Sequence, residues 1–295
     1  MNKRSISMAL GAVLLLMVGE SRIMAGREAG KDLAPREYRR EVDGWTLHAK
    51  RWSFQGSPLV FFAGGGEDMG AWKDIIPAFT SAYSVYTVDV DRNDRSIVPG
   101  EERMGQDRAT RIAPFIEQEC EKPVVLVGHS AGAMISLEIA AAHPEWVRAV
   151  VLEDPPGDIT VLFPWLRQQI KIKVLPVEEQ VQHFMDGGRT EEQAKKAAAN
   201  LEKFDHVALQ RLIDGKVEVD LRKLLPRLEA EALFVLGNPK KGSLTQEEYR
   251  TAIRQLLPDA TVSEWSEPGH HPHSSDPERF VREVKEFLQK IEGHK

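Results

Sequence analysis

The chain has 295 residues, of which 42% are hydrophobic and 28% charged, and its formal net charge is −6. This composition is that of an ordinary globular protein with enough apolar residues for a sizeable core. It excludes the strongly cationic surface that nucleic-acid binding requires. The single cysteine, Cys120, excludes an intramolecular disulfide and a cysteine-based zinc site.

Residues 1–25 have the order of a secretory signal peptide. A short basic region, residues 2–4, precedes an apolar run at 8–18, and the small residues Ala25 and Gly26 follow. The apolar run is shorter than the ~20 residues that span a bilayer, so no stable membrane span is expected. We predict a secreted or periplasmic protein. Two alternatives stay open: an uncleaved anchor, or translation that starts at Met24 and leaves a cytoplasmic protein.

Strand patterns begin with a hairpin, in which residues 38–42 and 45–54 flank the strong turn signal Asp43-Gly44. Apolar strands then alternate with amphipathic helices, a pattern typical of a parallel sheet covered on both faces. The sequence therefore predicts an α/β fold with a mainly parallel sheet of about eight strands. Further strands are predicted at residues 58–63, 84–90, 123–127, 147–152, 232–236 and 261–265.

Helical spacing and helix-start signals indicate where helices lie in the rest of the chain. Thr245 and Glu248 have the spacing of a capping box, and Asp276-Pro277 supplies a cap followed by a proline suited to the first helical position. Residues 157–227 contain helical patches but no convincing strand, so we predict a helical cap inserted into a core of residues 26–156 and 228–295. Core helices are predicted at residues 71–79, 109–116 and 130–143, after Thr245 and after Asp276.

The motif Gly128-His129-Ser130-Ala131-Gly132 lies directly between a predicted strand and a predicted helix. This is the setting of a Gly-x-Ser-x-Gly nucleophile elbow, in which a strained turn exposes the serine hydroxyl above the sheet. The glycines remove side chains that would collide with neighbouring backbone. Ser130 is therefore the predicted nucleophile, and His129 is expected to have a packing role.

From about residue 38 to residue 289 the chain resembles the α/β-hydrolase family. Residues 58–72 are similar to the family's oxyanion strand and loop, although Ala63-Gly64 replaces the usual His-Gly. The resemblance implies that the backbone N–H groups of Gly65 and Ala131 hold the oxyanion. A plain tight turn at residues 64–66 is the alternative.

The segment Gly269-His270-His271-Pro272-His273 and the helix that follows it resemble the family's base loop, which implies that His270 is the general base. Three histidines this close also raise the question of a metal. No Cys and no Glu-x-x-His partner completes a ligand set, so no metal is expected.

The triad acid is the least defined position. The family most often carries an Asp shortly after the strand predicted at residues 232–236, but residues 237–241 contain no carboxylate. Some members take the acid from the end of the preceding strand, where this chain has Glu153 and Asp154. Spacing from that strand favours Glu153 over Asp154. A site without an acid remains open.

These features predict a serine hydrolase that cleaves a small ester, thioester or lactone through an acyl-enzyme and needs no cofactor. The partner is a small-molecule substrate, and the sequence does not define the oligomeric state. Phe163, Trp165 and Phe184 in the predicted cap are candidates for an apolar substrate pocket. Two alternatives are a non-catalytic binding protein on the same fold and a cofactor-free lyase or C–C hydrolase with the same Ser-His site.

Overall fold

The predicted leader lies outside the residues that the structure describes, so secretion stays a prediction. Within the described part of the chain, no helix is long and apolar enough to cross a membrane. The computed structural model describes residues 35–42, 45–65, 67–89, 106–158, 160, 163–202, 210, 213–214 and 220–293.

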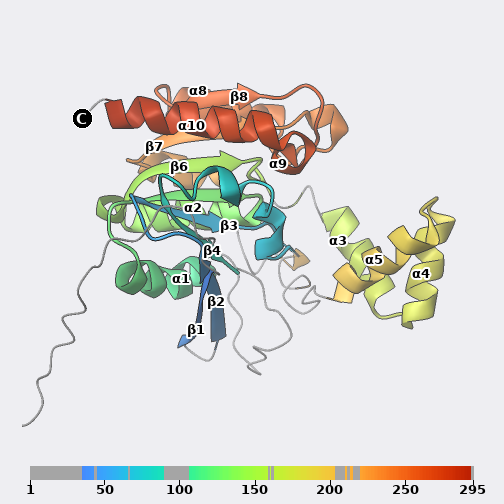
Figure 1. Ribbon diagram of the computed structural model, residues 1–295. Helices are drawn as coiled ribbons and strands as arrows, with labels where there is room; N and C mark the ends of the chain where they lie inside the picture. Colours follow the sequence, from blue (N-terminus) through green and yellow to red (C-terminus); the bar gives the residue numbers. More distant parts are fainter. Residues whose placement is uncertain are drawn as a thin grey trace, which may run out of the picture. The chain divides into compact units, whose positions relative to one another are not determined.

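The described residues form one eight-stranded sheet in the order β1-β2-β4-β3-β5-β6-β7-β8 (Figure 1). β2 pairs antiparallel with β1 and with β4, and all other neighbours are parallel. The predicted mainly parallel sheet with an antiparallel hairpin at one edge is thus confirmed. The strands are β1 Arg36–Val42, β2 Trp45–Arg51, β3 Pro58–Phe62, β4 Ser84–Val88, β5 Val124–His129, β6 Val147–Glu153, β7 Glu231–Leu236 and β8 Thr261–Glu264.

The central strands are buried on both faces of the sheet. Successive strand residues point to opposite sides, so Leu59 and Phe61 join one apolar cluster while Val60 and Phe62 join the other. Burial on both sides explains why these strands are continuous apolar runs in the sequence. Four helices and two 3-10 turns supply most of the covering side chains: η1 Met69–Trp72, η2 Ile76–Ala78, α1 Gln106–Glu119, α2 Ala131–Ala142, α8 Glu247–Leu256 and α10 Pro277–Gly293.

Two local expectations need correction. Residues 71–79 were expected to form one helix, but the structure has two short 3-10 turns there, η1 and η2; Pro77 lies at the start of η2 and has no N–H for a continuous helical ladder. The capping box at Thr245 is also wrong, because α8 begins at Glu247 with Gln246 as its N-cap, and the Thr245 hydroxyl donates to the carbonyl of Pro155 at 2.7 Å. At Asp276 the prediction is confirmed, since its carboxylate accepts from the N–H of Arg279 at 3.0 Å.

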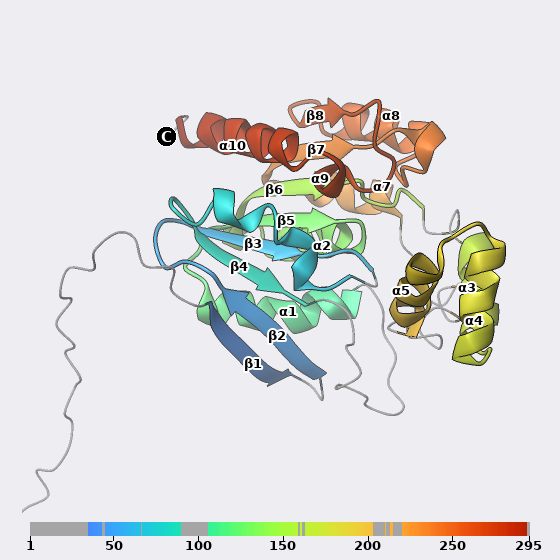
Figure 2. The same cartoon turned by 45° about the vertical axis from the view of Figure 1, so that its right-hand side comes forward.

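The described chain between β6 and β7 is mainly helical, with an isolated antiparallel bridge between Asp158 and Asp220. The helices α3, α4 and α5 pack on one another, and α7 packs on α2 and α8 (Figure 2). This agrees with helical patches at residues 157–227, while a role as a cap over the site stays a prediction. The helices are α3 Phe163–Lys173, α4 Val177–Asp186, α5 Glu191–Glu202 and α7 Leu221–Leu224, and the short 3-10 turn η5 Leu225–Arg227 leads into β7.

Candidate active site

Ser130 lies in the tight turn between β5 and α2. Its φ of 52° and ψ of −115° belong to a region that residues with a side chain rarely adopt. A Cβ atom on Gly128 would lie 2.2 Å from the carbonyl oxygen of Gly132, and one on Gly132 would lie 2.3 Å from that of Phe62. Both glycines are therefore needed for the turn to close, as the elbow motif predicts.

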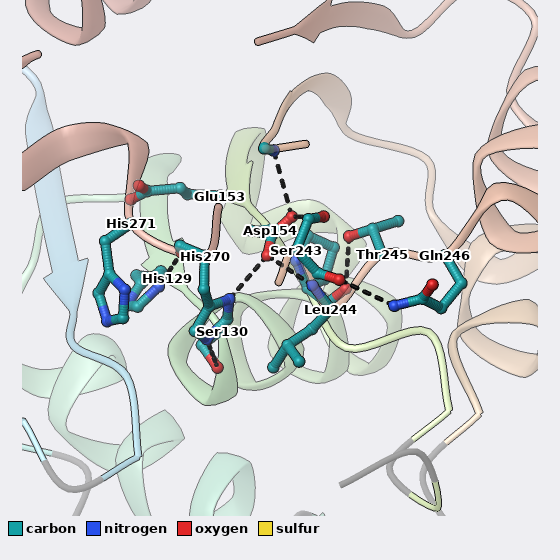
Figure 3. A network of polar contacts seen from close by, with 12 residues as sticks. His129, Ser130, Glu153, Asp154, Ser243, Leu244, Thr245, Gln246, His270 and His271 are labelled. Atoms are coloured by element: carbon teal, nitrogen blue, oxygen red, sulfur yellow. Dashed lines mark hydrogen bonds and ion pairs between the residues drawn. The ribbon is translucent and has the colours of Figure 1, made fainter. Parts of the chain in front are cut away.

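The structure brings Ser130, His270 and Asp154 into one hydrogen-bonded line (Figure 3). His270 lies in the loop between β8 and the short helix α9, Pro272–Ser275. Its Nε2 is 2.9 Å from Ser130 Oγ, and its Nδ1 is 2.6 Å from Asp154 Oδ2. Because the carboxylate can only accept, Nδ1 carries the proton and Nε2 is free to accept from the serine hydroxyl.

The preference for Glu153 as the partner of His270 is wrong. Both oxygens of Glu153 bind His273, accepting from its backbone N–H at 2.7 Å and lying 2.9 and 2.8 Å from its Nδ1. Glu153 is the last residue of β6, whereas Asp154 already leaves the strand with a φ of 43°. Two consecutive side chains at a strand end point in different directions, so counting from the strand did not decide between them.

The loop after β7 holds the Asp154 carboxylate, although it contains no acid itself. Asp154 accepts from the hydroxyl of Ser243 at 2.5 Å, from the N–H of Leu244 at 2.8 Å and from the N–H of Gly237 at 3.3 Å (Figure 3). The sequence analysis did not identify Ser243 or Leu244, because nothing local marks donors that serve a side chain about 90 positions earlier. Together with His270, these donors fix the position of the carboxylate.

The surroundings of His270 favour its neutral form. Burial lowers the pKa of its imidazole, and the nearby charge of His129 lowers it further. These effects outweigh the hydrogen bond to Asp154, which would raise the pKa. A neutral imidazole at neutral pH is the form that can remove a proton from Ser130.

The two residues whose backbone amides are expected to hold an oxyanion lie close to each other. Ala131 is the first residue of α2, so its N–H is in the turn where amides have no acceptor within the helix. A Cβ atom on Gly65 would lie 3.9 Å from the Cβ of Ala131. The N–H of Gly64 donates instead to Glu67 Oε2 at 2.8 Å, so of the two glycines that the structure describes in this loop, Gly65 is the candidate donor.

His129 has a more specific environment than packing. Its Nδ1 is 2.9 Å from Glu67 Oε2, and its Nε2 is 2.8 Å from the backbone carbonyl oxygen of His270. Burial alone would lower the pKa of His129, but the charge of Glu153 and the hydrogen bond to Glu67 outweigh it and raise the pKa to about 9. Glu67 has its own pKa well below the ordinary range: burial would raise it, but the contacts with His129 and His271 prevail.

Among the described residues, Glu67, His129 and His271 bring possible metal-ligating atoms within 4.8 Å of one another. The 2.9 Å separation of Glu67 Oε2 and His129 Nδ1 is a hydrogen-bond distance, and we interpret the contact as a hydrogen bond. We assign no metal there. Cys120 is buried, and burial raises the pKa of its thiol to about 12, so the thiol stays protonated at neutral pH and is a poor nucleophile.

Two of the three predicted pocket aromatics have described side chains. The guanidinium of Arg167 lies 5.6 Å from the ring of Phe163, and that of Arg189 lies 5.0 Å from the ring of Phe184. Trp165 is part of α3, and its side chain is outside the described part of the structure. These local contacts do not test a pocket role, which stays a prediction.

Comparison with known proteins agrees with this fold. A family model described as alpha/beta hydrolase family matches residues 59–283. The pimeloyl-[acyl-carrier protein] methyl ester esterase of Chromobacterium violaceum is 24% identical over 250 residues, 80% of this chain and 95% of that protein. The N-formylmaleamate deformylase of Pseudomonas putida is 23% identical over 254 residues, 84% of this chain and 94% of that protein. The crystal structure of E-2-(acetamidomethylene)succinate hydrolase shares the fold, with a TM-score of 0.69 at 19% identity over 87% of this chain and 100% of that chain.

Proposed function

The chain belongs to the alpha/beta hydrolase family, and from this we propose that it is a serine hydrolase that cleaves a small carboxylic ester, thioester or lactone through an acyl-enzyme. The observation that carries the proposal is the hydrogen-bonded line Ser130–His270–Asp154. Nucleophile, base and orienting acid are the three parts that acyl transfer requires. A protein that only binds its ligand has no need of this line.

In the proposed first step, Ser130 Oγ attacks the substrate carbonyl carbon while its proton passes to His270 Nε2. The carbonyl π electrons move to oxygen, and the N–H groups of Gly65 and Ala131 stabilise the resulting oxyanion. The tetrahedral intermediate then expels the alcohol or thiol, which takes the proton from His270. Asp154 orients the imidazole and stabilises its positive charge during the transfer.

In the second step, water replaces the leaving group. His270 removes a proton from the water, whose oxygen attacks the acyl carbon bound to Ser130. The oxyanion forms in the same place, and its collapse releases the carboxylic acid and returns the proton to Ser130. All the groups that this cycle needs belong to the chain itself.

Two relatives support an acyl substrate. The similar esterase of Chromobacterium violaceum acts on a methyl ester, and the similar deformylase of Pseudomonas putida acts on N-formylmaleamate, as their names state. Both reactions pass through attack on a carbonyl carbon. A C–C hydrolase with the same Ser-His chemistry remains a second candidate, because it would use the same nucleophile and base.

A substrate panel tests the proposal. Chromogenic esters of graded acyl length, a thioester, a lactone and a vinylogous diketone are offered to the wild type and to Ser130→Ala. We expect turnover of at least one oxygen or sulfur ester, lost by more than about 10³-fold in Ser130→Ala. Turnover of the diketone alone would favour the C–C hydrolase, and turnover unaffected by Ser130→Ala would overturn both.

A further inference from the structure

His129 presents both of its ring nitrogens to groups that can only accept a hydrogen bond. The carbonyl oxygen of His270 faces Nε2 at 2.8 Å, and the carboxylate of Glu67 faces Nδ1 at 2.9 Å. Since a neutral imidazole carries one N–H, a neutral His129 would leave one of these contacts without a proton. With Glu67 ionised, as its lowered pKa favours, the two contacts call for an imidazolium in a ring that is 1% exposed.

The groups around this ring come from three separate loops. Glu67 belongs to the loop after β3, and Glu153, which ends β6, contributes a second negative charge. The other neighbours are the histidines after β8, whose ring centroids lie 4.6, 4.8 and 5.2 Å from that of His129: His270, His271 and His273. Two carboxylates thus compensate the imidazolium, which agrees with its raised pKa.

We propose that Glu67 and His129 form a partly buried ion pair that positions the catalytic loops, so that both are positioning residues of the reaction proposed above. The carboxylate accepts from the N–H of Gly64, next to the oxyanion donor Gly65. The imidazolium, next to Ser130 in the chain, donates to the carbonyl of the residue that acts as the base. One ion pair therefore joins the oxyanion loop, the nucleophile elbow and the base loop.

The fixed positive charge has a second consequence. It lies beside the ring of His270 and disfavours a second positive charge there, so it contributes to the lowered pKa of the base. Removing the charge should raise that pKa. A purely structural role for Glu67 and His129 would not move it.

This inference rests on the proposed function for its catalytic part, but the charge state of His129 can be measured without any substrate. In protein labelled with ¹⁵N-histidine, NMR should show protons on both ring nitrogens of His129 at pH 7.5 and on only one of His270. His129→Gln identifies the His129 signals. A neutral His129 at pH 7.5 would overturn the proposal, as would stoichiometric binding of Zn²⁺ that requires Glu67.

Kinetics on the best ester test the positioning role. Glu67→Gln and His129→Gln should each lower kcat/KM by ~10–100-fold, the scale of loss when reacting groups move by about 1 Å. In His129→Gln, the midpoint of the acidic limb in the pH profile of kcat/KM should shift upward by about one pH unit. The double variant Glu67→Gln/His129→Gln should lower the unfolding temperature by less than the two single losses added together, because each single change already removes the contact between the two side chains.

The matched control is His271→Gln. His271 approaches the other oxygen of Glu67 at 3.4 Å, but its side chain is 46% exposed. We expect less than about a threefold change in kcat/KM, as for an exposed ion pair. The acidic limb should shift less than in His129→Gln, because His271 also lies beside His270, at 4.9 Å between ring centroids, but is more exposed to solvent. Equal losses of kcat/KM in His271→Gln and in His129→Gln would contradict the positioning role. An acidic limb at the wild-type pH in both variants would contradict it as well. Should Ser130 prove unreactive, the NMR result still decides whether the ion pair exists.

Discussion

Asp154 and Glu153 are adjacent carboxylates with separate partners, and this separation makes a direct test possible. Asp154 binds His270 and Glu153 binds His273. Asp154→Asn should keep the fold but lower kcat by ~10²–10⁴-fold, because a neutral amide can neither hold the correct tautomer nor stabilise the imidazolium. Steady-state kinetics on the best ester of the panel measures the loss.

Glu153→Gln is the matched control for that change. Glu153 and Asp154 are both fully buried. The change therefore alters an equally buried carboxylate, but one that does not contact His270. We expect a smaller loss of kcat, less than about tenfold, with thermal unfolding at a lower temperature because His273 loses its charged partner. A larger loss of kcat in Glu153→Gln than in Asp154→Asn would contradict the assignment of the acid.

The state of His270 predicts how activity depends on pH. Its pKa is lowered, mainly by burial, so the neutral form persists below the ordinary histidine value of about 6.5. As pH falls through the pKa of His270, the base becomes protonated and activity is lost. The acidic limb of kcat/KM should therefore have its midpoint below about pH 6.5. A midpoint above pH 7 would show that His270 is not the titrating base or that its environment differs.

At the scale of elements, a buried arginine organises the loop after β7 that holds Asp154. Arg250 in α8 is 3% exposed and donates to the carbonyls of Thr245 and Gly237 and to the hydroxyl of Ser243. Ser243 in turn donates to Asp154. The loop that lacks the family's usual acid thus acts through hydrogen bonds on the acid of a neighbouring strand.

Removing this arginine should weaken the fold. Arg250→Met should lower the free energy of unfolding by about 3 kcal/mol, because buried acceptors lose a charged donor. Arg254→Met is the control: Arg250 and Arg254 both bind Glu264 Oε1, at 3.0 and 2.6 Å, but the side chain of Arg254 is 47% exposed. Urea unfolding should show a loss of less than about 1 kcal/mol for this control. Equal losses in the two variants would contradict the role of Arg250.

Some features of these elements could be predicted from the sequence because their signals are local. The elbow motif specified Ser130, and the cap-proline pair specified the start of α10. Thr245 also had a local capping pattern, but its hydroxyl binds Pro155, 90 positions earlier. The His129–Glu67 contact spans 62 positions and leaves no periodic signal. Local sequence patterns therefore do not predict contacts between loops that are far apart in the chain and meet at the ends of the strands.

At the scale of the whole molecule, the alternation of apolar strands and helices in the sequence was enough to predict the mainly parallel sheet. Every core strand is buried on both faces, so each has a continuous apolar run that the sequence displays. This pattern was not enough to choose between Glu153 and Asp154 as the acid, because the choice depends on the backbone turn at Asp154, where φ is 43°. A single residue's φ at the end of a strand is not encoded in hydrophobic periodicity.

The helices between β6 and β7 carry a prediction about specificity. If they line the acyl site, then Phe163→Ala and Phe184→Ala should change the preferred acyl chain length, since apolar side chains set pocket size. The rate on the smallest ester should change by less than about threefold, because the catalytic groups lie elsewhere. Relative kcat/KM values over the graded esters measure this, and an unchanged preference in both variants would contradict the cap assignment.

The central claim is that Ser130 is a nucleophile activated by His270. Intact-mass spectrometry after treatment with a fluorophosphonate probe tests it most directly, because the probe reacts with an activated serine and needs no known substrate. The account predicts one probe mass on the wild type and none on Ser130→Ala. Labelling of Ser130→Ala to the same extent as the wild type, or no labelling of folded wild-type protein, would contradict it.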